Sequence, residues 1–298
     1  MYHEIIKEIS KELNIKYKIL SNNWVISLEK DNKIKYITGY KFDLNNHASA
    51  LVIDDKYAMY DTLKKTNIPV IEHYLLYSEK NKEKYALGKN KKSQALAYFN
   101  NHQKDIIIKG NHGTCGKEVY HITRKKDLYK TLNLLFKKEE SLSLCPFYKI
   151  DSEYRVIVLN NKIELIYEKI RPIIYGDGVS KISTLLKEFN PSYNYLIKKD
   201  KVLKKDEKYT YTFKHNLSSG SIINTKIDNP KDITNLAMKV AKTLNISFGS
   251  IDIIKVANKY YIMECNSGVM MSNLINLLPN GYTIAKNIYQ KAIIAMFS

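Results

Sequence analysis

The residues FGSIDIIKVANKYYIMECN, at positions 248–266, carry the clearest structural signal in the chain. Two runs rich in β-branched and aromatic residues flank a short polar segment, a pattern that predicts a β-hairpin. If residues 257–259 form a three-residue loop, Asp252 lies directly opposite Glu264. Glu264 and Asn266 are two apart on one strand, so their side chains point to the same face. The hairpin therefore predicts that the side-chain oxygens of Asp252, Glu264 and Asn266 converge.

Two carboxylates and an amide oxygen are typical of a site for a hard cation such as Mg²⁺. Mg²⁺ that has few protein ligands usually also binds phosphates. The alternative is a surface hairpin whose polar face meets water. We favour the metal site, because the polar residues interrupt an otherwise apolar pattern and an unpaired buried carboxylate would be costly.

Length and composition set the outer limits. The chain has 298 residues, 44% of them hydrophobic, which is enough for a sizeable core and for two or three domains. Its first residues are charged and amphipathic, unlike a signal peptide, and no apolar run approaches transmembrane length. The three cysteines are scattered without metal-ligand spacing, which favours a reduced compartment. We expect a soluble cytoplasmic protein without a membrane partner.

The formal net charge of +18 raises the hypothesis of a nucleic-acid partner. Arginine, however, occurs only at positions 124, 155 and 171, so the excess is almost entirely lysine, accompanied by abundant Ile, Asn and Tyr. That mixture is typical of a genome-wide codon bias, with lysines spread over solvated faces. We therefore discount nucleic acid, although a positive field would also attract ATP or an acidic substrate.

The first third of the chain alternates helical and extended patterns. An amphipathic helix of about a dozen residues begins the chain, and strands are expected at 24–28 and 34–37. Asp54 or Asp55 can cap a further helix, which ends before Pro69. The charged stretch 78–92 is expected to connect two domains.

A second informative stretch, IIIKGNHGTCGKEVY at 106–120, predicts a strand, a glycine-spaced loop and another strand. The glycines let backbone N–H groups approach an anion closely, and Lys109 supplies a charge at the strand end. By itself such a hairpin is more often simply a turn. His112 and Cys115 have no visible third group to orient them, so we interpret them as loop residues.

Two of the three arginines, Arg155 and Arg171, lie on a second predicted hairpin formed by 152–159 and 163–171. Arginine offers paired donors that suit phosphate or carboxylate. An equally good interpretation is a structural arginine paired with a carboxylate of the sheet, such as Glu153 or Glu168.

In their order and spacing, these motifs resemble the ATP-grasp ligases. The resemblance is greatest to the ATP-grasp region of cyanophycin synthetases and bifunctional glutathione synthetases, and covers about residues 50–290. It rests on short motifs along the chain: Asp55-Lys56, Lys109 with Gly110-Asn111-His112-Gly113, Glu153-Tyr154-Arg155, Gly176-Asp177-Gly178, Asn216-Leu217-Ser218-Ser219-Gly220, Asp252, and Glu264-Cys265-Asn266.

The resemblance implies an α+β ATP-grasp fold of antiparallel sheets with helices, in which the nucleotide lies between a small lid domain and the C-terminal domain. The implied parts are an N-terminal α/β domain (1–85), the lid (86–144) and a C-terminal domain with the metal hairpin (145–298). It also implies roles for individual residues. The ATP-binding set is Lys56, Lys109, Gly110, Gly113, Thr114, Gly116, Glu153 (at the ribose) and Asn216; the catalytic set is Arg155, Lys169 and Arg171; the metal ligands are Asp252, Glu264 and Asn266.

Two departures from the family pattern stand out. Cys145-Pro146 replaces the acidic residue that usually precedes the adenine-contacting segment, which leaves that contact to backbone groups. Residues 211–215 lack the arginines of the relatives, and Lys214 or His215 is a candidate replacement. The chain also lacks the large partner domains of those relatives, so the synthesis of cyanophycin or glutathione is not implied.

The implied function is an ATP-dependent carboxylate–amine ligase that forms an acylphosphate and releases ADP and phosphate. The implied cofactors are ATP and Mg²⁺, with two ions and with Mn²⁺ as a substitute. The substrates are small-molecule or peptide carboxylates and amines, and a homodimer is compatible with the sequence. The lysine and tyrosine content of 190–215 could fit an acidic peptide, but we favour a solvated insertion.

Two alternatives from other classes stay open. The first is a non-catalytic ATP-binding regulatory module, against which the intact metal-ligand set argues. The second is a lysine-rich RNA-binding protein, which would bind in a salt-dependent manner without ATP turnover.

Overall fold

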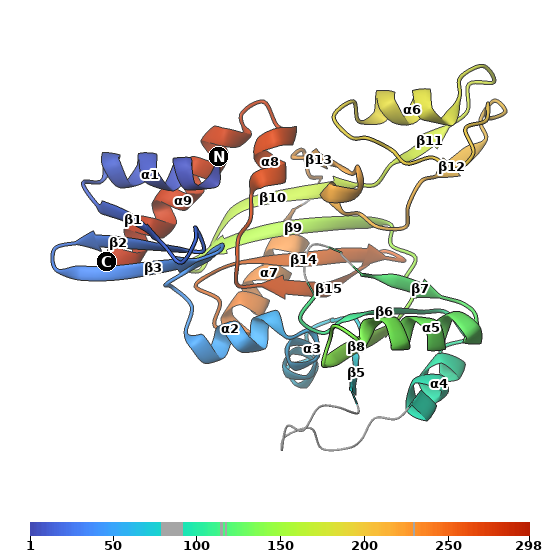
Figure 1. The fold of residues 1–298 in the computed structure, drawn as a ribbon, viewed down its shortest axis with the longest axis horizontal. Helices are drawn as coiled ribbons and strands as arrows, with labels where there is room; N and C mark the ends of the chain where they lie inside the picture. Colours follow the sequence, from blue (N-terminus) through green and yellow to red (C-terminus); the bar gives the residue numbers. More distant parts are fainter. Residues whose placement is uncertain (79–91, 114–115, 117, 229) are drawn as a thin grey trace.

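The computed structural model describes residues 1–298 apart from 79–91, 114–115, 117 and 229 (Figure 1). Within the described residues the strands form antiparallel sheets in the orders β1-β2-β3-β4, β5-β8-β6-β7, β13-β10-β9-β14-β15 and β11-β12. The predicted α+β class with antiparallel sheets is confirmed. The predicted boundary at residue 85 falls outside the described residues, and the division into 1–85, 86–144 and 145–298 stays a prediction.

The N-terminal part packs against the end of the chain. Its elements are α1 (Tyr2–Glu12), β1 (Lys16–Leu20), β2 (Val25–Lys30), β3 (Lys33–Thr38) and β4 (Lys41–Phe42). The apolar face of α1, which includes Ile5 and Ile9, shares one core with Ile288 and Ile293 of α9 (Gly281–Phe297). Residues 1–42 therefore bury their apolar surface against a helix that is distant in sequence (Figure 1).

Two helices then lead to the lid sheet, the name used here for β5-β8-β6-β7. The helices are α2 (His47–Asp54) and α3 (Lys56–Lys65). The lid elements follow in the order β5 (Tyr74–Tyr77), α4 (Lys92–Asn101), β6 (Ile106–Gly110), β7 (Tyr120–Ile122), α5 (Lys125–Leu135) and β8 (Ser141–Pro146). Apolar residues of α4 and α5 cover one face of this sheet and close a separate core.

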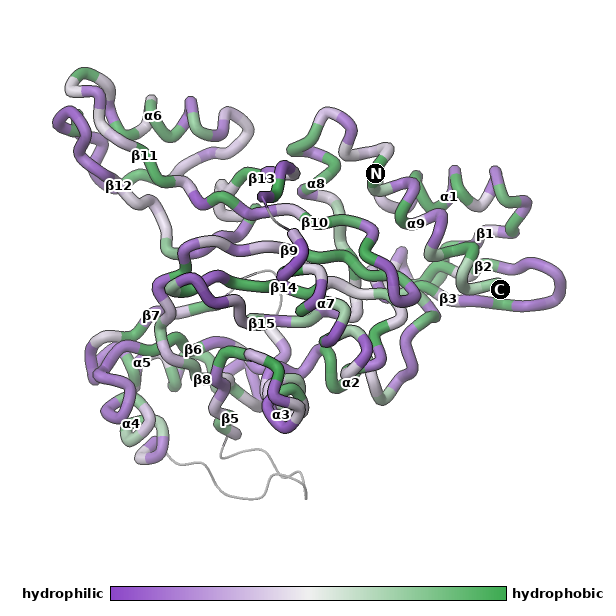
Figure 2. The backbone as a smooth tube through the Cα atoms, turned by 180° about the vertical axis from the view of Figure 1, so that it is seen from behind, coloured by the Kyte–Doolittle hydropathy of each residue, from purple (hydrophilic) through white to green (hydrophobic). Residues whose placement is uncertain are grey.

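The central sheet separates two cores because its side chains alternate between its faces. It contains β9 (Ser152–Leu159), β10 (Lys162–Ile170), β13 (Ile222–Asn224), β14 (Phe248–Val256) and β15 (Lys259–Asn266). One face packs on α7 (Lys231–Thr243) and α3, and the other joins the core of α1 and α9. α8 (Ser272–Leu277) precedes α9. Figure 2 shows hydrophobic positions along β9 and β14 in the middle of the molecule.

A small unit projects beyond the end of β10 (Figure 1). It contains β11 (Ile173–Tyr175), α6 (Ile182–Phe189) and β12 (Lys208–Thr210), and we call residues 173–211 the insertion. The insertion has its own core of Ile174, Ile182, Leu186 and Leu203. The short 3-10 helix η1 (Leu217–Ser219) then leads the chain back to β13 of the central sheet.

Across the part of the chain that the structure describes, no helix combines the length and the apolar character that a membrane crossing requires.

Candidate active site

The turn of the β14–β15 hairpin contains two residues, so the predicted three-residue loop is wrong. Val256 pairs with Lys259, and the turn residues Ala257 and Asn258 both have positive φ, at 46° and 64°. This conformation joins two antiparallel strands without splaying them. Asparagine tolerates it well, but an alanine with positive φ is uncommon, so the sequence gives little sign of it.

A β-bulge restores the predicted pairing of the metal-ligand candidates. Beyond the turn, Ile253 pairs with Ile262, whereas Asp252 pairs with Glu264, which leaves Met263 as an extra residue on β15. Without this bulge, Asp252 would face Met263. Bulges occur preferentially beside active sites, where they redirect side chains. Asp252 and Glu264 are therefore opposite each other as predicted, although the loop and the bulge together produce the register.

A buried ion-pair network surrounds Asp252. The Arg155 guanidinium donates to both carboxylate oxygens, from Nε at 2.8 Å and from Nη2 at 2.7 Å. Lys169 Nζ lies 3.0 Å from Asp252 Oδ1 and 2.6 Å from Glu153 Oε1. Because β9, β10 and β14 are adjacent in the sheet, these side chains share one face. Arg155 is thus paired with a carboxylate of the sheet, as the structural interpretation of this arginine predicts, and the partner is Asp252.

The charges of this network are coupled. Burial alone would raise the pKa of Asp252, but Arg155 and Lys169 hold it below its ordinary value. Burial and Arg155 would lower the pKa of Lys169, but Asp252 and Glu153 raise it above its usual range. Asp252 and Lys169 are therefore both charged at neutral pH.

Lys56 connects the glycine-spaced loop to the hairpin. Its ammonium donates to the carbonyl of Gly113 at 2.5 Å and to that of Asn111 at 3.2 Å, and lies 3.7 Å from Glu264 Oε1. Burial lowers the pKa of Lys56, while Glu264 acts in the opposite direction. Of the two predicted caps, Asp54 and Asp55, it is Asp55 that precedes this helix, and its carboxylate accepts from the N–H of Ala58.

The glycine-spaced loop also touches the segment that follows the insertion. Gly116 has φ of +63°, and a Cβ at this position would lie 2.3 Å from Asn216 Nδ2. Lys214 Nζ donates to the Gly116 carbonyl at 3.0 Å, and burial lowers the pKa of Lys214. Gly113 lies against the Gly110 carbonyl, while Thr114, an ATP-binding candidate, lies outside the described residues.

We expect Gly116→Ala to lower kcat/KM for ATP by about tenfold, because the methyl group displaces Asn216 and the backbone is strained. The measurement is ADP release against ATP concentration. Gly178→Ala is the matched control, since Gly178 also has positive φ, at +85°, but a Cβ there meets only ordinary contacts at 3.8 Å. Equal losses in both variants would contradict a specific contact with Asn216.

Two cations of the predicted set have side chains without a partner among the described residues. There, the Lys109 ammonium and the Arg171 guanidinium take part in no hydrogen bond and no ion pair, although the backbone of Lys109 pairs with Ser143 in the lid sheet. Lys109 lies on β6 with only 8% of its surface exposed, and its charge helps to lower the pKa of the buried Lys56. Burial, followed by Lys109 and Lys56, also lowers the pKa of His73, so that imidazole is neutral. A buried ammonium without a counter-ion is costly, and a bound anion would compensate it.

The hairpin residues fit a magnesium site that phosphates complete. Glu264 is 20% exposed and its nearest cation is 3.7 Å away, so a carboxylate oxygen can bind a metal ion. In the described region, the Asn266 side chain has no hydrogen-bond partner, and no three Asp, Glu, His or Cys residues form a metal cluster alone. One or two carboxylates together with substrate phosphates are the usual ligands of Mg²⁺ in nucleotide sites.

His215 and Asn216 lie near the ion-pair network and the glycine-spaced loop, respectively. His215 is buried, its Nδ1 lies 2.9 Å from the Lys169 carbonyl, and burial lowers its pKa. Whether Lys214 or His215 replaces a family arginine stays a prediction. The Asn216 side chain accepts from the N–H of Ser218 and so shapes the turn that follows.

Sequence reasoning missed the support behind Asn266. Asp54, at the end of α2, accepts from the Ser267 N–H at 2.8 Å, from the Ser267 hydroxyl at 2.6 Å and from Lys41 Nζ at 2.6 Å. It therefore fixes the backbone directly after Asn266. The local sequence signal is an acidic residue beside a helix boundary, which predicts a cap.

We expect Asp54→Asn to raise the Mg²⁺ concentration for half-maximal ADP release by about tenfold, because groups that orient metal ligands affect affinity on this scale. Asp61→Asn is the control, since Asp61 makes only an exposed pair with Lys65 on α3. An unchanged Mg²⁺ requirement in Asp54→Asn would show that the position of Asn266 does not depend on this anchor.

Comparison with known structures identifies the fold. A bifunctional glutathione synthetase from Pasteurella multocida superposes on 97% of this chain and 43% of its own, with a TM-score of 0.54 and 17% identity. A D-alanine–D-alanine ligase from Bacillus anthracis covers 87% of this chain and 71% of its own, with a TM-score of 0.56 and 14% identity. This chain has the ATP-grasp fold.

Sequence comparison agrees with that assignment. Residues 195–290 match the family model of the RimK-like ATP-grasp domain. A glutathione biosynthesis bifunctional protein, GshAB, of Listeria monocytogenes is 23% identical over 172 residues, which cover 55% of this chain and 20% of that protein. The chain therefore matches only about a fifth of the length of this relative. The resemblance to ATP-grasp ligases is confirmed.

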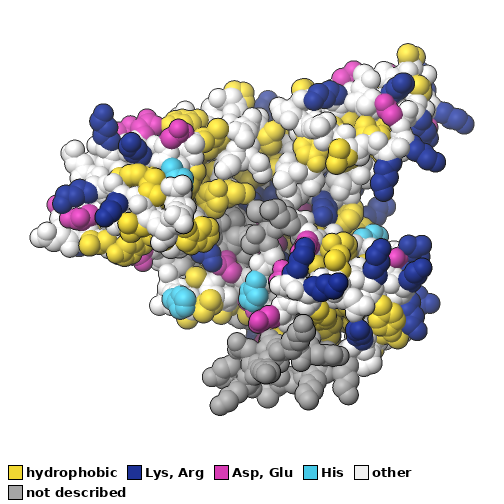
Figure 3. All heavy atoms as spheres, viewed as in Figure 1, with side chains coloured by type: hydrophobic (Ala, Val, Ile, Leu, Met, Phe, Trp, Pro, Cys, Tyr) yellow, Lys and Arg dark blue, Asp and Glu magenta, His cyan; other side chains and the backbone are white. Residues whose placement is uncertain are grey.

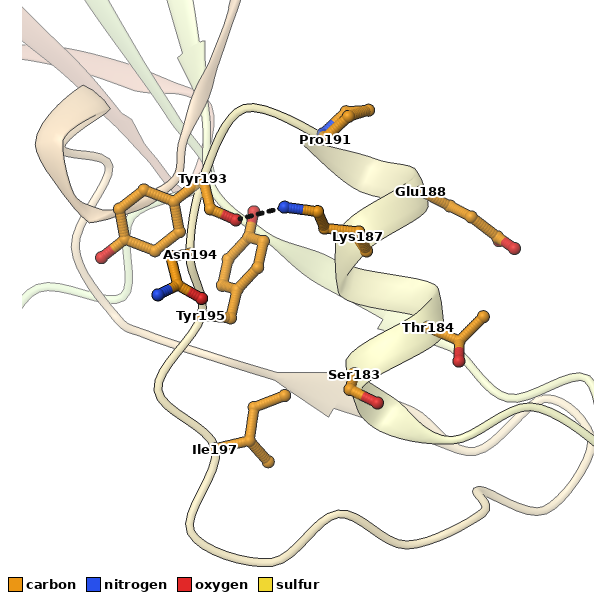
Figure 4. A pocket seen from close by; sticks show the side chains of 9 residues that line it. All are labelled: Ser183, Thr184, Lys187, Glu188, Pro191, Tyr193, Asn194, Tyr195 and Ile197. Atoms are coloured by element: carbon orange, nitrogen blue, oxygen red, sulfur yellow. Dashed lines mark hydrogen bonds between the residues drawn. The ribbon is translucent and has the colours of Figure 1, made fainter.

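A distinct cavity lies outside the predicted site of this ATP-grasp chain. It has a volume of about 660 Å³ and lies between α6 and the loop that follows it, as Figure 4 shows. Lys187 Nζ donates to the Tyr193 carbonyl at 3.5 Å across it. None of the predicted ATP-binding, catalytic or metal-binding residues lines it.

Proposed function

We propose that the chain is an ADP-forming carboxylate–amine ligase that acts through an acylphosphate. The observation that carries the proposal is the buried Lys109, whose ammonium has no partner in the described part of the chain and which lies beside Lys56 and the Asp252–Glu264 hairpin. This arrangement supplies positive charge for nucleotide phosphates next to oxygen ligands for a cation. Relatives with this fold include ligases, and one structure of the ligase PsnB contains Mg and ADP.

The proposed reaction has two steps. A substrate carboxylate oxygen attacks the γ-phosphorus of ATP, the bond to the β-phosphate oxygen breaks, and ADP leaves. The amine then attacks the acyl carbon, the C–N bond forms, phosphate leaves and the amine loses a proton. Both steps require neutralisation of phosphate charge more than a protein nucleophile.

The described contacts divide the roles among the cations. Among the residues that the structure describes, Lys109 and Arg171 have no counter-ion, so we assign them to the phosphates. Arg155 and Lys169 are held by carboxylates, so we assign them to the positioning of Asp252 and Glu153. If Glu153 contacts the ribose as proposed, its carboxylate must accept a hydrogen bond from the ribose in addition to its ion pair with Lys169.

Asp252, Glu264 and Asn266 would hold Mg²⁺, which would neutralise phosphate charge and orient the phosphates. We propose two ions, with Mn²⁺ able to replace Mg²⁺. The loop containing Gly110, Gly113 and Gly116 would exclude water from the acylphosphate, and Lys56 would hold this loop against the hairpin.

A screen of carboxylate and amine pairs for Mg-ATP-dependent ADP release tests the proposal. A ligase will release ADP only when both substrates are present and will form one amide per ADP. A protein that binds ATP but releases no ADP with any pair would be a regulatory module, and one that binds RNA without ATP turnover would contradict the ligase assignment.

A further inference from the structure

A second hollow, of about 690 Å³, lies between the insertion and the turn of residues 216–220. Four lysines contribute to its lining, namely Lys198, Lys199, Lys201 and Lys214. It is distinct from the cavity of Figure 4, since Tyr193 is the one described residue that lines both. Figure 3 shows lysine and arginine side chains gathered at this end of the molecule. We call this second hollow, with the lining residues given above, the lysine hollow.

The lysine hollow is rich in positive charge, since four lysines and no acidic residue line it. Lys198 and Lys199 have no hydrogen bond or ion pair within the described residues. Lys201 is paired with Glu207 at 2.9 Å. The adjacent Asp200 directs its carboxylate to the N–H and hydroxyl of Ser183, at 2.9 and 2.7 Å. A ligand with several negative charges would therefore gain from binding here.

The walls favour a peptide over a single-stranded nucleic acid. Two tyrosines that line the hollow, Tyr193 and Tyr211, pack edge to face against the ring of Tyr195, at 4.6 and 4.9 Å. These two rings are engaged by Tyr195 instead of standing apart as platforms on which successive bases stack. Leu196 is 82% exposed at the hollow and offers an apolar contact. Carboxylates spaced along a polypeptide suit separate lysines with apolar surface between them.

The hollow leads towards the proposed ATP site. Lys214 and Ser219 line it, and they flank Asn216, which lies against Gly116. Lys214 Nζ also donates to the Gly116 carbonyl. Asn190 and Tyr195 of the insertion both donate to the Gly220 carbonyl, at 3.1 and 3.0 Å, and so fix the insertion on this turn.

We propose that the lysine hollow is a docking subsite for an acidic peptide, which binds through carboxylates at Lys198 and Lys199 and presents a reacting group to the ATP site. The presentation step rests on the proposed ligase function, whereas the docking step does not. The proposal assigns a role to a segment whose composition alone favoured a merely solvated insertion.

The test is fluorescence anisotropy of fluorescein-labelled hexaglutamate with the full chain and without nucleotide. Hexaglutamate will bind more tightly than labelled hexaglutamine. The double variant Lys198→Glu/Lys199→Glu will weaken binding by about tenfold or more, and added salt will weaken wild-type binding. Lys204→Glu/Lys205→Glu is the matched control, because it makes the same charge change on the insertion at exposed residues outside the hollow. It will change binding less than about twofold.

Equal losses in both double variants would overturn the proposal, since binding would then follow net charge alone. Tighter binding of a labelled hexauridylate, lost in Lys198→Glu/Lys199→Glu, would replace the peptide with a nucleic acid and also overturn it. The docking test is separate from ligase activity. Hexaglutamate binding without any ADP release would defeat the proposed function alone, whereas ADP release without hexaglutamate binding would defeat the docking subsite alone.

Discussion

Replacing Asp252 with asparagine will lower Mg-ATP-dependent ADP release by about a hundredfold to a thousandfold, the scale of removing one preorganised electrostatic contact. The carboxylate is the proposed metal ligand, and it also balances Arg155 and Lys169 in the buried network. The amide keeps the shape of the side chain but removes its charge. The measurement is the initial rate of ADP release at saturating Mg²⁺, below the melting temperature of the variant.

Glu264→Gln separates the metal role from stability. Because Glu264 is partly exposed and 3.7 Å from Lys56, we expect this variant to melt nearly as the wild type does and to lose activity on the same scale as Asp252→Asn. Glu29→Gln, which removes an exposed partner of Lys16, is the control and will keep its activity. Full turnover in Asp252→Asn or in Glu264→Gln would show that the hairpin residues are not the metal ligands.

The hairpin shows what the sequence could and could not predict. The alternation of residue types places Asp252, Glu264 and Asn266 on strands, and it shows that an oxygen-rich site interrupts an apolar sheet. The loop length was wrong by one residue, and the bulge at Met263 compensates by one residue. Nothing in the sequence marks Met263 as a bulge, as a glycine would, because a bulge depends on how both flanking strands pack and not on the bulged residue alone.

Contacts between distant segments were the part that the sequence could not predict. The helical pattern of residues 2–12 predicts an apolar face but not that α9 covers it. The family motif predicts that Lys56 contacts ATP phosphates, whereas in the structure its ammonium donates to the carbonyls of Asn111 and Gly113. A carbonyl acceptor leaves no trace in residue identity. The partners of charged residues therefore come from the fold, although the charged residues themselves were found from the sequence.

Lys109→Met will reduce activity and raise stability at once. ADP release will fall by about a hundredfold, because the proposed phosphate contact is lost. The free energy of unfolding of the ligand-free protein will rise by about 1 kcal/mol, since methionine removes a buried charge that has no partner in the described structure. The initial rate of ADP release measures the first effect, and circular dichroism melts with and without the non-hydrolysable analogue AMP-PNP and Mg²⁺ measure the second together with nucleotide binding. The wild type will gain thermal stability from the analogue, and the variant will gain less.

Lys169→Met is the matched control, because Lys169 is an equally buried lysine whose carboxylate partners are present. Its loss leaves Glu153 and Asp252 short of a cation, so this variant will lose about 3 kcal/mol of unfolding free energy. The same substitution thus has opposite effects on stability at two lysines of one site. The charge of Lys169 is balanced by carboxylates of the protein, whereas that of Lys109 has no counter-ion among the described residues and is proposed to bind a phosphate. If Lys109→Met is destabilised as Lys169→Met is, Lys109 already has an anionic partner in the folded chain and cannot be the phosphate contact.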